Sequence, residues 1–230
     1  MPLTRSLATW FSDYNSQDSA GSKLRAKRIE PLLELIKSFA ARHEEVHVID
    51  IGGSDTYWGI VPRQFLLDHR VKITIVNVPG SRLPNAHGPF TFIEADGCKL
   101  DGFADGAFHI AHSNSVVEHV GDWSRMREFA QELQRVSQTY FVQTPNFWFP
   151  IEPHFMTPFF HWLPKPMRVW LVRKFSLGTF PKASNVDEAM VFVEHARLLN
   201  REMFSFLFQD AEVSTERFFG LPKSFVALKK

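Results

Sequence analysis

Small and hydrogen-bonding residues follow four segments of this chain that have the composition of buried strands. The segments VHVIDI (46–51), KITIVNV (72–78), FTFIEAD (90–96) and AFHIAHSNS (107–115) are short and largely apolar or β-branched, which is typical of a parallel sheet. Ligands of open α/β sheets bind at the carboxyl ends of the strands, where the strand order reverses. The sequence therefore predicts a ligand site made of the residues at these four ends: Asp50, Gly52, Gly53, Ser54, Asp55, Asn77, Asp96, Gly97, Ser113 and Asn114.

The turn after the first strand, VIDIGGSDTYWG (48–59), indicates which ligands suit the site. A dinucleotide fingerprint needs G-x-G-x-x-G at the start of a helix, and this turn lacks that pattern. A cofactor without phosphates needs less: one close backbone approach, a polar group for a ribose and another for an adenine. Gly52, Asn77 and Asp96 supply these in chain order. The alternative is an ordinary sharp turn at the two glycines.

Two of these stretches resemble motifs of a known family. VIDIGGSDTYW is similar to the first motif, and FHIAHSNSVVEHVGDW to the fourth, of class I S-adenosylmethionine-dependent methyltransferases, particularly the type 11-like branch that acts on small molecules. The resemblance covers about residues 46–145. It implies S-adenosyl-L-methionine as the cofactor, with the following residues binding it: Asp50, Gly52, Gly53, Ser54, Asn77, Val78, Asp96, Gly97, Cys98, Ser113 and Asn114.

The chain departs from the family pattern at three positions. Ser54 and Thr56 stand where glycines are customary, and Asn77 replaces the usual acid that accepts from the ribose hydroxyls. An asparagine still accepts through its carbonyl oxygen, and a serine permits close approach of the backbone if its φ is negative. We therefore expect a modified but usable cofactor loop.

The resemblance places Glu118 and His119 near the site of methyl transfer, although both could instead anchor the turn that carries them. In FPIEPHF (149–155), Glu152 and His154 form a polar island between prolines in an aromatic stretch. This loop is either braced for structure or faces the methyl acceptor, and we expect the second. Glu118, His119 and His154 are then the catalytic residues, and Asn146, Glu152 and His154 bind the substrate.

Outside these motifs the pattern predicts one α/β domain over residues 1–230. Helical spacing over 22–43 and 123–136 favours an open, mostly parallel, Rossmann-like sheet flanked by helices, with an N-terminal helical extension at 1–45. Residues 145–181 contain seven prolines among aromatic residues, which predicts an irregular insertion or a lid of short helices at about 146–181 on the substrate side. A helical stretch at 186–209, broken near Asn200, and a C-terminal antiparallel strand pair complete the expected fold.

Composition excludes several classes of function. Lys and Arg number 26 against 25 Asp and Glu, so a global field that would attract nucleic acid is absent. The single Cys98 suits a reducing compartment. Ten histidines are present, but their spacing along the sequence offers no compact ligand set, and we expect no metal. Neither a signal peptide nor a membrane span is predicted, which favours a cytoplasmic protein.

Residues 155–175 combine basic and aromatic side chains without an acid. Lys165, Arg168, Arg173 and Lys174 alternate there with Phe, Trp, Leu and Val. Such a segment suits peripheral contact with the inner face of a membrane. The alternatives are a roof over the active site and a homodimer contact.

The function predicted from the sequence is methyl transfer from S-adenosylmethionine to a small-molecule or glycan acceptor, including a lipid-linked sugar or a cell-surface polysaccharide precursor. Two other classes stay open. A non-catalytic, partner-binding member of the fold would explain the altered glycine loop. A nicotinamide-dependent oxidoreductase would share the sheet but should carry the dinucleotide glycines.

Overall fold

A computed structural model of the chain describes the backbone of residues 20–230 and the side chains of residues 26–230. Its centre is a seven-stranded sheet in the order β3-β2-β1-β4-β5-β9-β8. The first five strands of the chain are parallel, β9 is antiparallel to β5, and β8 is antiparallel to β9. The strands are β1 Val46–Ile51, β2 Val71–Asn77, β3 Phe90–Glu94, β4 Phe108–Asn114, β5 Ser137–Pro145, β8 Glu212–Phe218 and β9 Leu221–Lys229.

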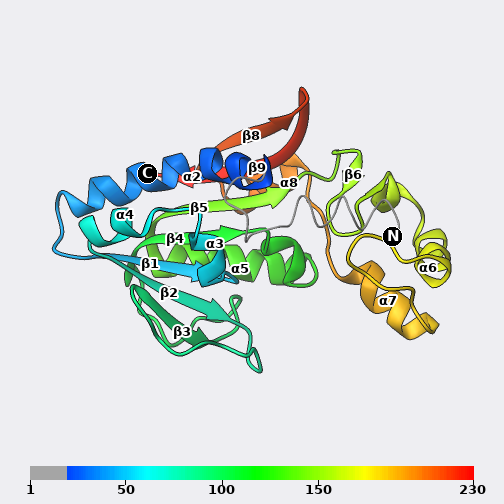
Figure 1. Cartoon of the computed structure of the whole chain (residues 1–230), viewed down its shortest axis with the longest axis horizontal. Coiled ribbons are helices and arrows are strands. Elements are labelled where there is room, and N and C mark those ends of the chain that lie inside the picture. The colour runs from blue at the N-terminus through cyan, green and yellow to red at the C-terminus, as the bar shows by residue number, and fades with distance from the viewer. Residues whose placement is uncertain (1–19) are drawn as a thin grey trace.

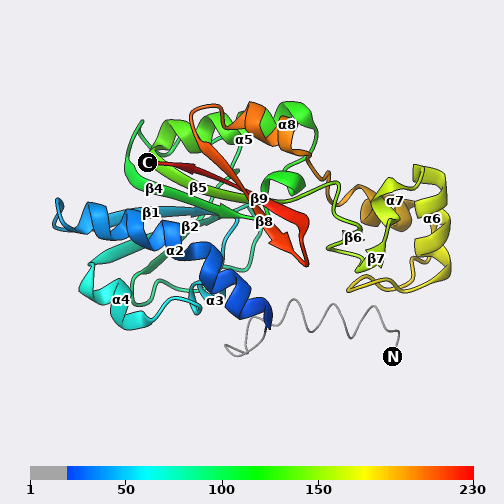
Figure 2. The same cartoon turned by 90° about the horizontal axis from the view of Figure 1, so that it is seen from above.

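Helices cover both faces of this sheet (Figures 1 and 2). One face carries α2 (Ala20–Ala40), α3 (Asp55–Trp58) and α4 (Arg63–Asp68), and the other carries α5 (Trp123–Val136) and α8 (Arg201–Leu207). Each face has its own hydrophobic core: Ile36, Trp58 and Leu66 belong to the first, and Phe129, Leu133 and Phe204 to the second. The central strands are therefore buried on both sides, as their apolar composition requires.

The insertion lies beyond the carboxyl ends of the parallel strands (Figure 1). It contains β6 (Ile151–Glu152), β7 (Thr157–Pro158), the 3₁₀ helix η2 (Phe160–Trp162) and α6 (Lys165–Lys174), followed by α7 (Val186–Glu194). A third hydrophobic core holds it together, made of Phe155, Phe160, Val172, Ala183, Ala189 and Val193. The insertion thus has a hydrophobic core of its own, separate from the two cores of the sheet.

The predicted fold class is confirmed: a mostly parallel, helix-flanked sheet with a C-terminal antiparallel pair. The helix predicted at 123–136 has these bounds, and the Asp122 side chain caps it by accepting from the Arg125 N–H at 3.0 Å. The predicted break at Asn200 is also present, since Asn200 caps α8 by accepting from the Met203 N–H. Of the N-terminal extension, residues 1–19 lie outside the described part.

Three short elements, α3, α4 and the β6–β7 pair, were not predicted. The helices have four and six residues, and each of the two strands has two. The helices complete at most about two turns, and each strand has a single residue on each face, so hydrophobic periodicity cannot reveal them. Contacts with the rest of the fold decide their conformation.

The Asp50 carboxyl connects the elements that meet where the strand order reverses, between β1 and β4. It is fully buried, pairs with His112 Nδ1 of β4 at 2.7 Å and accepts from Trp58 Nε1 of α3 at 2.8 Å. The turn closes over it so tightly that a Cβ on Gly53 would lie 1.8 Å from Asp50 Oδ2. Asp50 therefore sets the position of the glycine turn.

Replacing Asp50 by alanine should destabilise the protein by about 2–6 kcal/mol, because two buried donors lose their acceptor at about 1–3 kcal/mol each. Urea denaturation monitored by circular dichroism measures the change. Asp68→Ala is the matched control: Asp68 is exposed and accepts from the exposed Gln64 side chain, so its loss should stay within about 0.5 kcal/mol. Equal losses in the two variants would contradict the role given to Asp50.

Candidate functional site

The glycine turn after β1 lies against the segment that follows β4. Gly52 has φ +76°, and a Cβ there would lie 2.6 Å from a methyl carbon of Val116. Ser54 has φ −145° and caps α3 by accepting from the Tyr57 N–H. Because its φ is negative, Ser54 permits the close backbone approach that the sequence predicts at this position. The first and fourth strand ends are thus in direct contact.

Asn77 and Asp96 continue this edge across β2 and beyond β3. The Asn77 side-chain amide donates to the Gly53 carbonyl at 3.0 Å, which ties the second strand end to the glycine turn. Asp96 accepts from the Cys98 N–H at 2.9 Å and from the Arg125 guanidinium at 2.5 Å. Burial alone would raise the pKa of Asp96, but these hydrogen bonds and the Arg125 charge hold it below its usual range. Asp96 is therefore an anion with fixed partners.

The other residues predicted at this edge differ in exposure. Val78 is exposed, and Gly97 packs so closely on Ile51 and Phe129 that a side chain would clash. Burial raises the pKa of the Cys98 thiol to about 12, so it stays protonated and unreactive near neutral pH. Ser113 donates to the Ile51 carbonyl and Asn114 accepts from Arg28 of α2, which are contacts within the fold.

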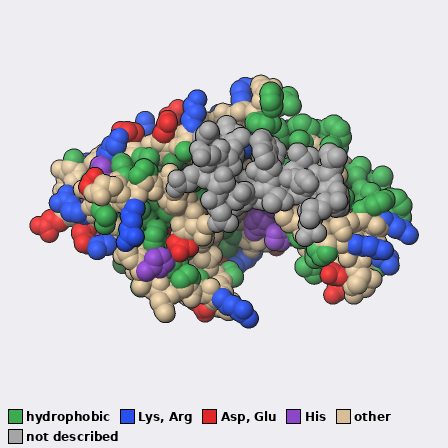
Figure 3. Space-filling model, in the orientation of Figure 1, with side chains coloured by type: hydrophobic (Ala, Val, Ile, Leu, Met, Phe, Trp, Pro, Cys, Tyr) green, Lys and Arg blue, Asp and Glu red, His purple; other side chains and the backbone are tan. Residues whose placement is uncertain are grey.

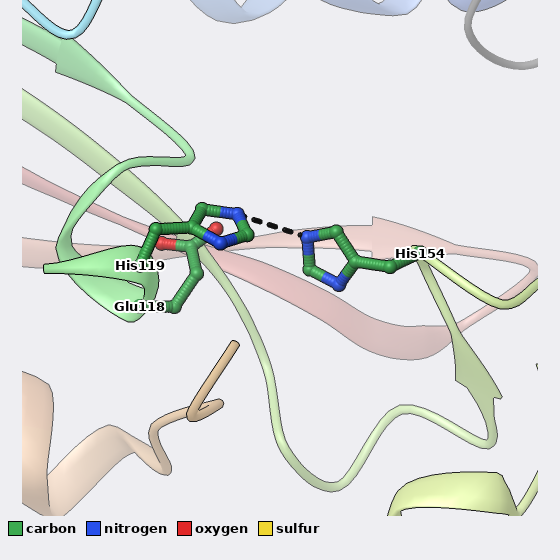
Figure 4. Close-up of side chains that lie close together, drawn as sticks. All are labelled: Glu118, His119 and His154. Atoms are coloured by element: carbon green, nitrogen blue, oxygen red, sulfur yellow. Dashed lines mark hydrogen bonds between the residues drawn. The ribbon is translucent and has the colours of Figure 1, made fainter. Parts of the chain in front are cut away.

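The three predicted catalytic residues come together in space. Glu118 and His119 belong to the 3₁₀ helix η1 (Val117–His119) after β4, and His154 lies in the loop between β6 and β7. The Nε2 atoms of His119 and His154 are 3.0 Å apart, and Figure 4 shows the two rings facing each other with the Glu118 carboxyl beside them. One ligand atom from each of the three residues lies within 4.8 Å of the others. The sequence offered no compact ligand set because 35 residues separate the two histidines, and the fold removes that separation.

Each member of this group is fixed by a second contact. Glu118 is buried and accepts from Thr144 Oγ1 at 2.9 Å, and its own carbonyl accepts from the Arg197 N–H. His119 Nδ1 lies 2.8 Å from the His195 carbonyl oxygen. His154 Nδ1 lies 2.8 Å from Glu152 Oε1.

Burial and these neighbours shift the pKa values in different directions. Burial raises the pKa of Glu118 to about 7. Burial, and then the proximity of His154, lowers the pKa of His119 to about 4. Burial opposes protonation of His154 too, but the hydrogen bond and charge of Glu152 outweigh it and raise its pKa. A neutral His119 therefore faces a more basic His154.

The loop that carries His154 is held by backbone contacts. Glu152 Oε2 accepts from the N–H groups of His154 and Phe155, at 2.7 and 2.5 Å. Gly178, with φ +58°, packs against the backbone of this loop, where an added Cβ would lie 2.4 Å from the His154 carbonyl oxygen. Asn146, predicted to bind substrate, is buried and used internally: it donates to the Pro222 carbonyl and accepts from the Trp148 N–H.

A cavity of about 360 Å³ opens beside His154, between the insertion and α7. Its lining includes the polar residues Glu152, His154, His161, Lys165, Arg168, Glu194, His195 and Arg197. Lys165 forms an ion pair with Glu194 at 2.5 Å. Burial lowers the pKa of the Arg168 guanidinium. Sequence reasoning missed His195 and Arg197, because the segment EHARLL (194–199) carries no motif, and a single histidine is a weak signal for a functional site.

Comparisons with solved structures identify the fold. The DszA carbon methyltransferase matches with a TM-score of 0.59 and 13% identity, over 96% of this chain and 60% of that chain. This chain has the class I methyltransferase fold. An O-methyltransferase family protein from Burkholderia thailandensis matches with a TM-score of 0.49 and 17% identity, over 98% and 63% of the two chains. A SAM-dependent methyltransferase from Methanosarcina mazei gives 0.48 and 14%, over 81% and 93%.

The chain spans less than two thirds of the DszA enzyme and of the Burkholderia protein. No protein-family model and no curated protein sequence matches it. At these identities the likeness concerns the fold, and the residues of the site have to be argued from their own geometry.

Gly178→Ala should displace the loop that carries His154. The matched control is Gly106→Ala, which also has a positive φ, +64°, but nothing within 4 Å of an added Cβ. The control should lose only the strain of a left-handed alanine, about 1–2 kcal/mol. Gly178→Ala should lose more and should expose the insertion to limited proteolysis. Equal stability and equal proteolysis would show that this packing does not hold the loop.

Proposed function

We propose that this chain is an S-adenosylmethionine-dependent methyltransferase that acts on a small-molecule or glycan acceptor. The observation that carries the proposal is the edge formed by the glycine turn, Asn77 and Asp96 in a sheet with the class I methyltransferase fold. Ligands of such sheets lie at this edge, beside the point where the strand order reverses.

The residues present fit the adenosine part of this cofactor. The side-chain amide N–H of Asn77 donates to the Gly53 carbonyl, and its side-chain carbonyl oxygen would accept from a ribose hydroxyl. Val78 offers an apolar surface next to it, and Asp96, Gly97 and Cys98 form the third strand end, where we expect the adenine. Gly52, Gly53 and Ser54 would lie under the methionine part. Asp50 would act on the cofactor through the turn that it holds, since its carboxyl is already bonded twice.

When bound, the cofactor supplies an electrophilic methyl group on sulfur, and the protein has to align the acceptor with it and exclude water. Val116 packs on Gly52 and precedes η1 directly, so the Glu118–His119–His154 group lies next to the cofactor edge. If the acceptor is a hydroxyl, His119 Nε2 is the ring nitrogen that would act as the base, because the Nδ1–H donates to the His195 carbonyl and leaves the lone pair on Nε2.

The cavity beside His154 is the proposed acceptor site. Arg168 and Arg197 line it, and the Arg168 Nε is buried without a partner among the described residues. Guanidinium groups bind oxygen-rich ligands through several donors. This lining favours a sugar, carboxylate or phosphate-bearing acceptor over an apolar one.

The two rival classes make different predictions. A partner-binding protein without activity would lack affinity for S-adenosylhomocysteine. An oxidoreductase would need the dinucleotide glycines, and Asp50 and Val116 crowd the turn that would carry them. Affinity for S-adenosylhomocysteine therefore separates the proposed function from both rival classes.

Calorimetry should detect S-adenosylhomocysteine binding, and Asp96→Ala should weaken it about fivefold, which corresponds to about 1 kcal/mol for one hydrogen bond. Asp101→Ala is the control, because Asp101 is exposed and pairs only weakly with Lys99 at 3.5 Å. Wild-type protein that binds neither S-adenosylhomocysteine nor S-adenosylmethionine would contradict the proposed function. An unchanged affinity in Asp96→Ala would remove Asp96 from the site.

We further propose that the insertion contacts an anionic membrane surface on the cytoplasmic side and so meets a lipid-linked acceptor. Six large apolar side chains there are 40–60% exposed: Trp148, Phe159, Trp162, Met167, Trp170 and Phe175. Figure 3 shows hydrophobic side chains gathered on this part of the molecule, with Lys and Arg beside them. Arg173 and Lys174, both exposed at the end of α6, supply positive charge. No helix in the described part of the chain is long and apolar enough to cross a membrane.

The protein should sediment with anionic vesicles at low salt and be released as salt rises, because each surface cation contributes about 1 kcal/mol that salt screens. The double variant Arg173→Glu and Lys174→Glu should stay in the supernatant with its S-adenosylhomocysteine affinity unchanged. Arg168 is unsuitable for this test, since it lines the cavity. Wild-type protein that remains in the supernatant at low salt would refute membrane contact, and a dimer in solution would then assign the aromatic patch to a second copy.

A further inference from the structure

The two histidine rings of the site meet in an unusual way. His119 Nδ1 lies against a backbone carbonyl, which can only accept, so this nitrogen carries a proton. His154 Nδ1 lies against Glu152 Oε1, and the other carboxylate oxygen, Oε2, accepts two backbone N–H groups. Because Oε1 acts as an acceptor, His154 Nδ1 carries a proton as well. In the neutral rings both Nε2 atoms therefore present lone pairs, and these atoms are 3.0 Å apart. Two lone pairs at this distance repel unless a cation lies between them.

A proton would satisfy the two histidines but not Glu118. Glu118 is 1% exposed, and its Oε1 has no partner among the described residues. A proton held between the rings leaves this buried Oε1 without a partner, which is costly whenever the carboxyl is ionised. A metal ion would bind all three groups at once.

The distance between the two histidine nitrogens fits such an ion. Two nitrogens bound to one ion at about 2.05 Å lie about 2.9 Å apart at a right angle and about 3.3 Å apart at the tetrahedral angle. The observed 3.0 Å falls between these values. The second contacts also match, because metal-binding histidines usually donate their other N–H to a carboxylate or a backbone carbonyl. His154 has the carboxylate and His119 has the carbonyl.

We propose that Glu118, His119 and His154 bind one divalent transition-metal ion, with Glu152 orienting His154. Two imidazoles and one carboxylate suit Zn²⁺, Co²⁺, Fe²⁺ or Mn²⁺, and three protein ligands leave coordination positions open for an oxygen of a further ligand. Because His154 also lines the 360 Å³ cavity, the ion lies at the border of that cavity. The metal site does not depend on methyl transfer, since it follows from these four side chains alone.

Co²⁺ titration of chelator-treated full-length protein tests the proposal, with the visible absorption of bound Co²⁺ and calorimetry as readouts. The wild type should bind one ion per chain and lose the Co²⁺ spectrum when Zn²⁺ is added. His154→Ala and Glu118→Gln should each weaken binding more than 100-fold, and Glu152→Gln about 10–100-fold, as is usual for an orienting carboxylate. Circular dichroism checks that each variant is folded, and the partly exposed His154 makes its variant the safest of the set.

His43→Ala is the matched control, because His43, His47 and His109 form a second group of histidine rings away from this site. It should leave Co²⁺ affinity unchanged. Absence of saturable binding in the wild type, or a loss in His43→Ala that equals the loss in His154→Ala, would overturn the proposal. All titrations omit S-adenosylmethionine and acceptor, so failure of the methyltransferase assignment leaves this result interpretable, and failure here leaves that assignment standing.

Discussion

The buried carboxyl of Asp50 is the constraint on which the rest of the ligand edge depends. It lies at the end of β1, where the strand order reverses, and binds one group from β4 and one from α3. A buried carboxyl without partners would cost several kcal/mol, so the elements that provide His112 and Trp58 are held next to it. The glycine turn then has only the space left over by Asp50 and Val116. The shape of the edge follows from packing inside the protein, before any ligand is considered.

A second constraint acts between the sheet and the insertion. The insertion has its own hydrophobic core, separate from the two cores of the sheet. Polar contacts join the two parts: Arg197 N–H donates to the Glu118 carbonyl, Phe147 N–H donates to the Leu199 carbonyl, and His154 meets His119. An aromatic contact between Phe149 and Phe218 of β8 adds to them. A ligand or ion bound by the Glu118–His119–His154 group would therefore also fix the insertion relative to the sheet.

The proposed ion and the proposed base use the same nitrogen. If His119 Nε2 coordinates a metal, it is no longer free to take a proton from the acceptor. A hydroxyl bound to the ion would instead lose its proton more easily, because a divalent cation lowers the pKa of a bound oxygen. Either arrangement needs the same fixed tautomers, and these are set by Glu152 and the His195 carbonyl. The orienting contacts are thus common to both mechanisms.

Much of this architecture follows from local pattern. The apolar runs of β1 and β2, the helical spacing that ends at Val136 and the capping residues Asp122 and Asn200 act over a few residues, so the sequence by itself determined these longer elements and the class of the sheet. Glu118 and His119 became candidates through the resemblance of their motif, and His154 through its neighbours in FPIEPHF, which are also features of short segments.

Only the tertiary structure decided how these candidates are used. Asp50 and Asn146 prove to be bonded within the fold, with partners in α3, β4 and β9, of which β4 and β9 are distant in sequence. His119 and His154 meet across 35 residues, and His195 orients one of them through a backbone carbonyl, which carries no side-chain signal. Spacing along the chain could therefore not reveal the compact ligand set, because its geometry depends on how the insertion folds back over the end of β4.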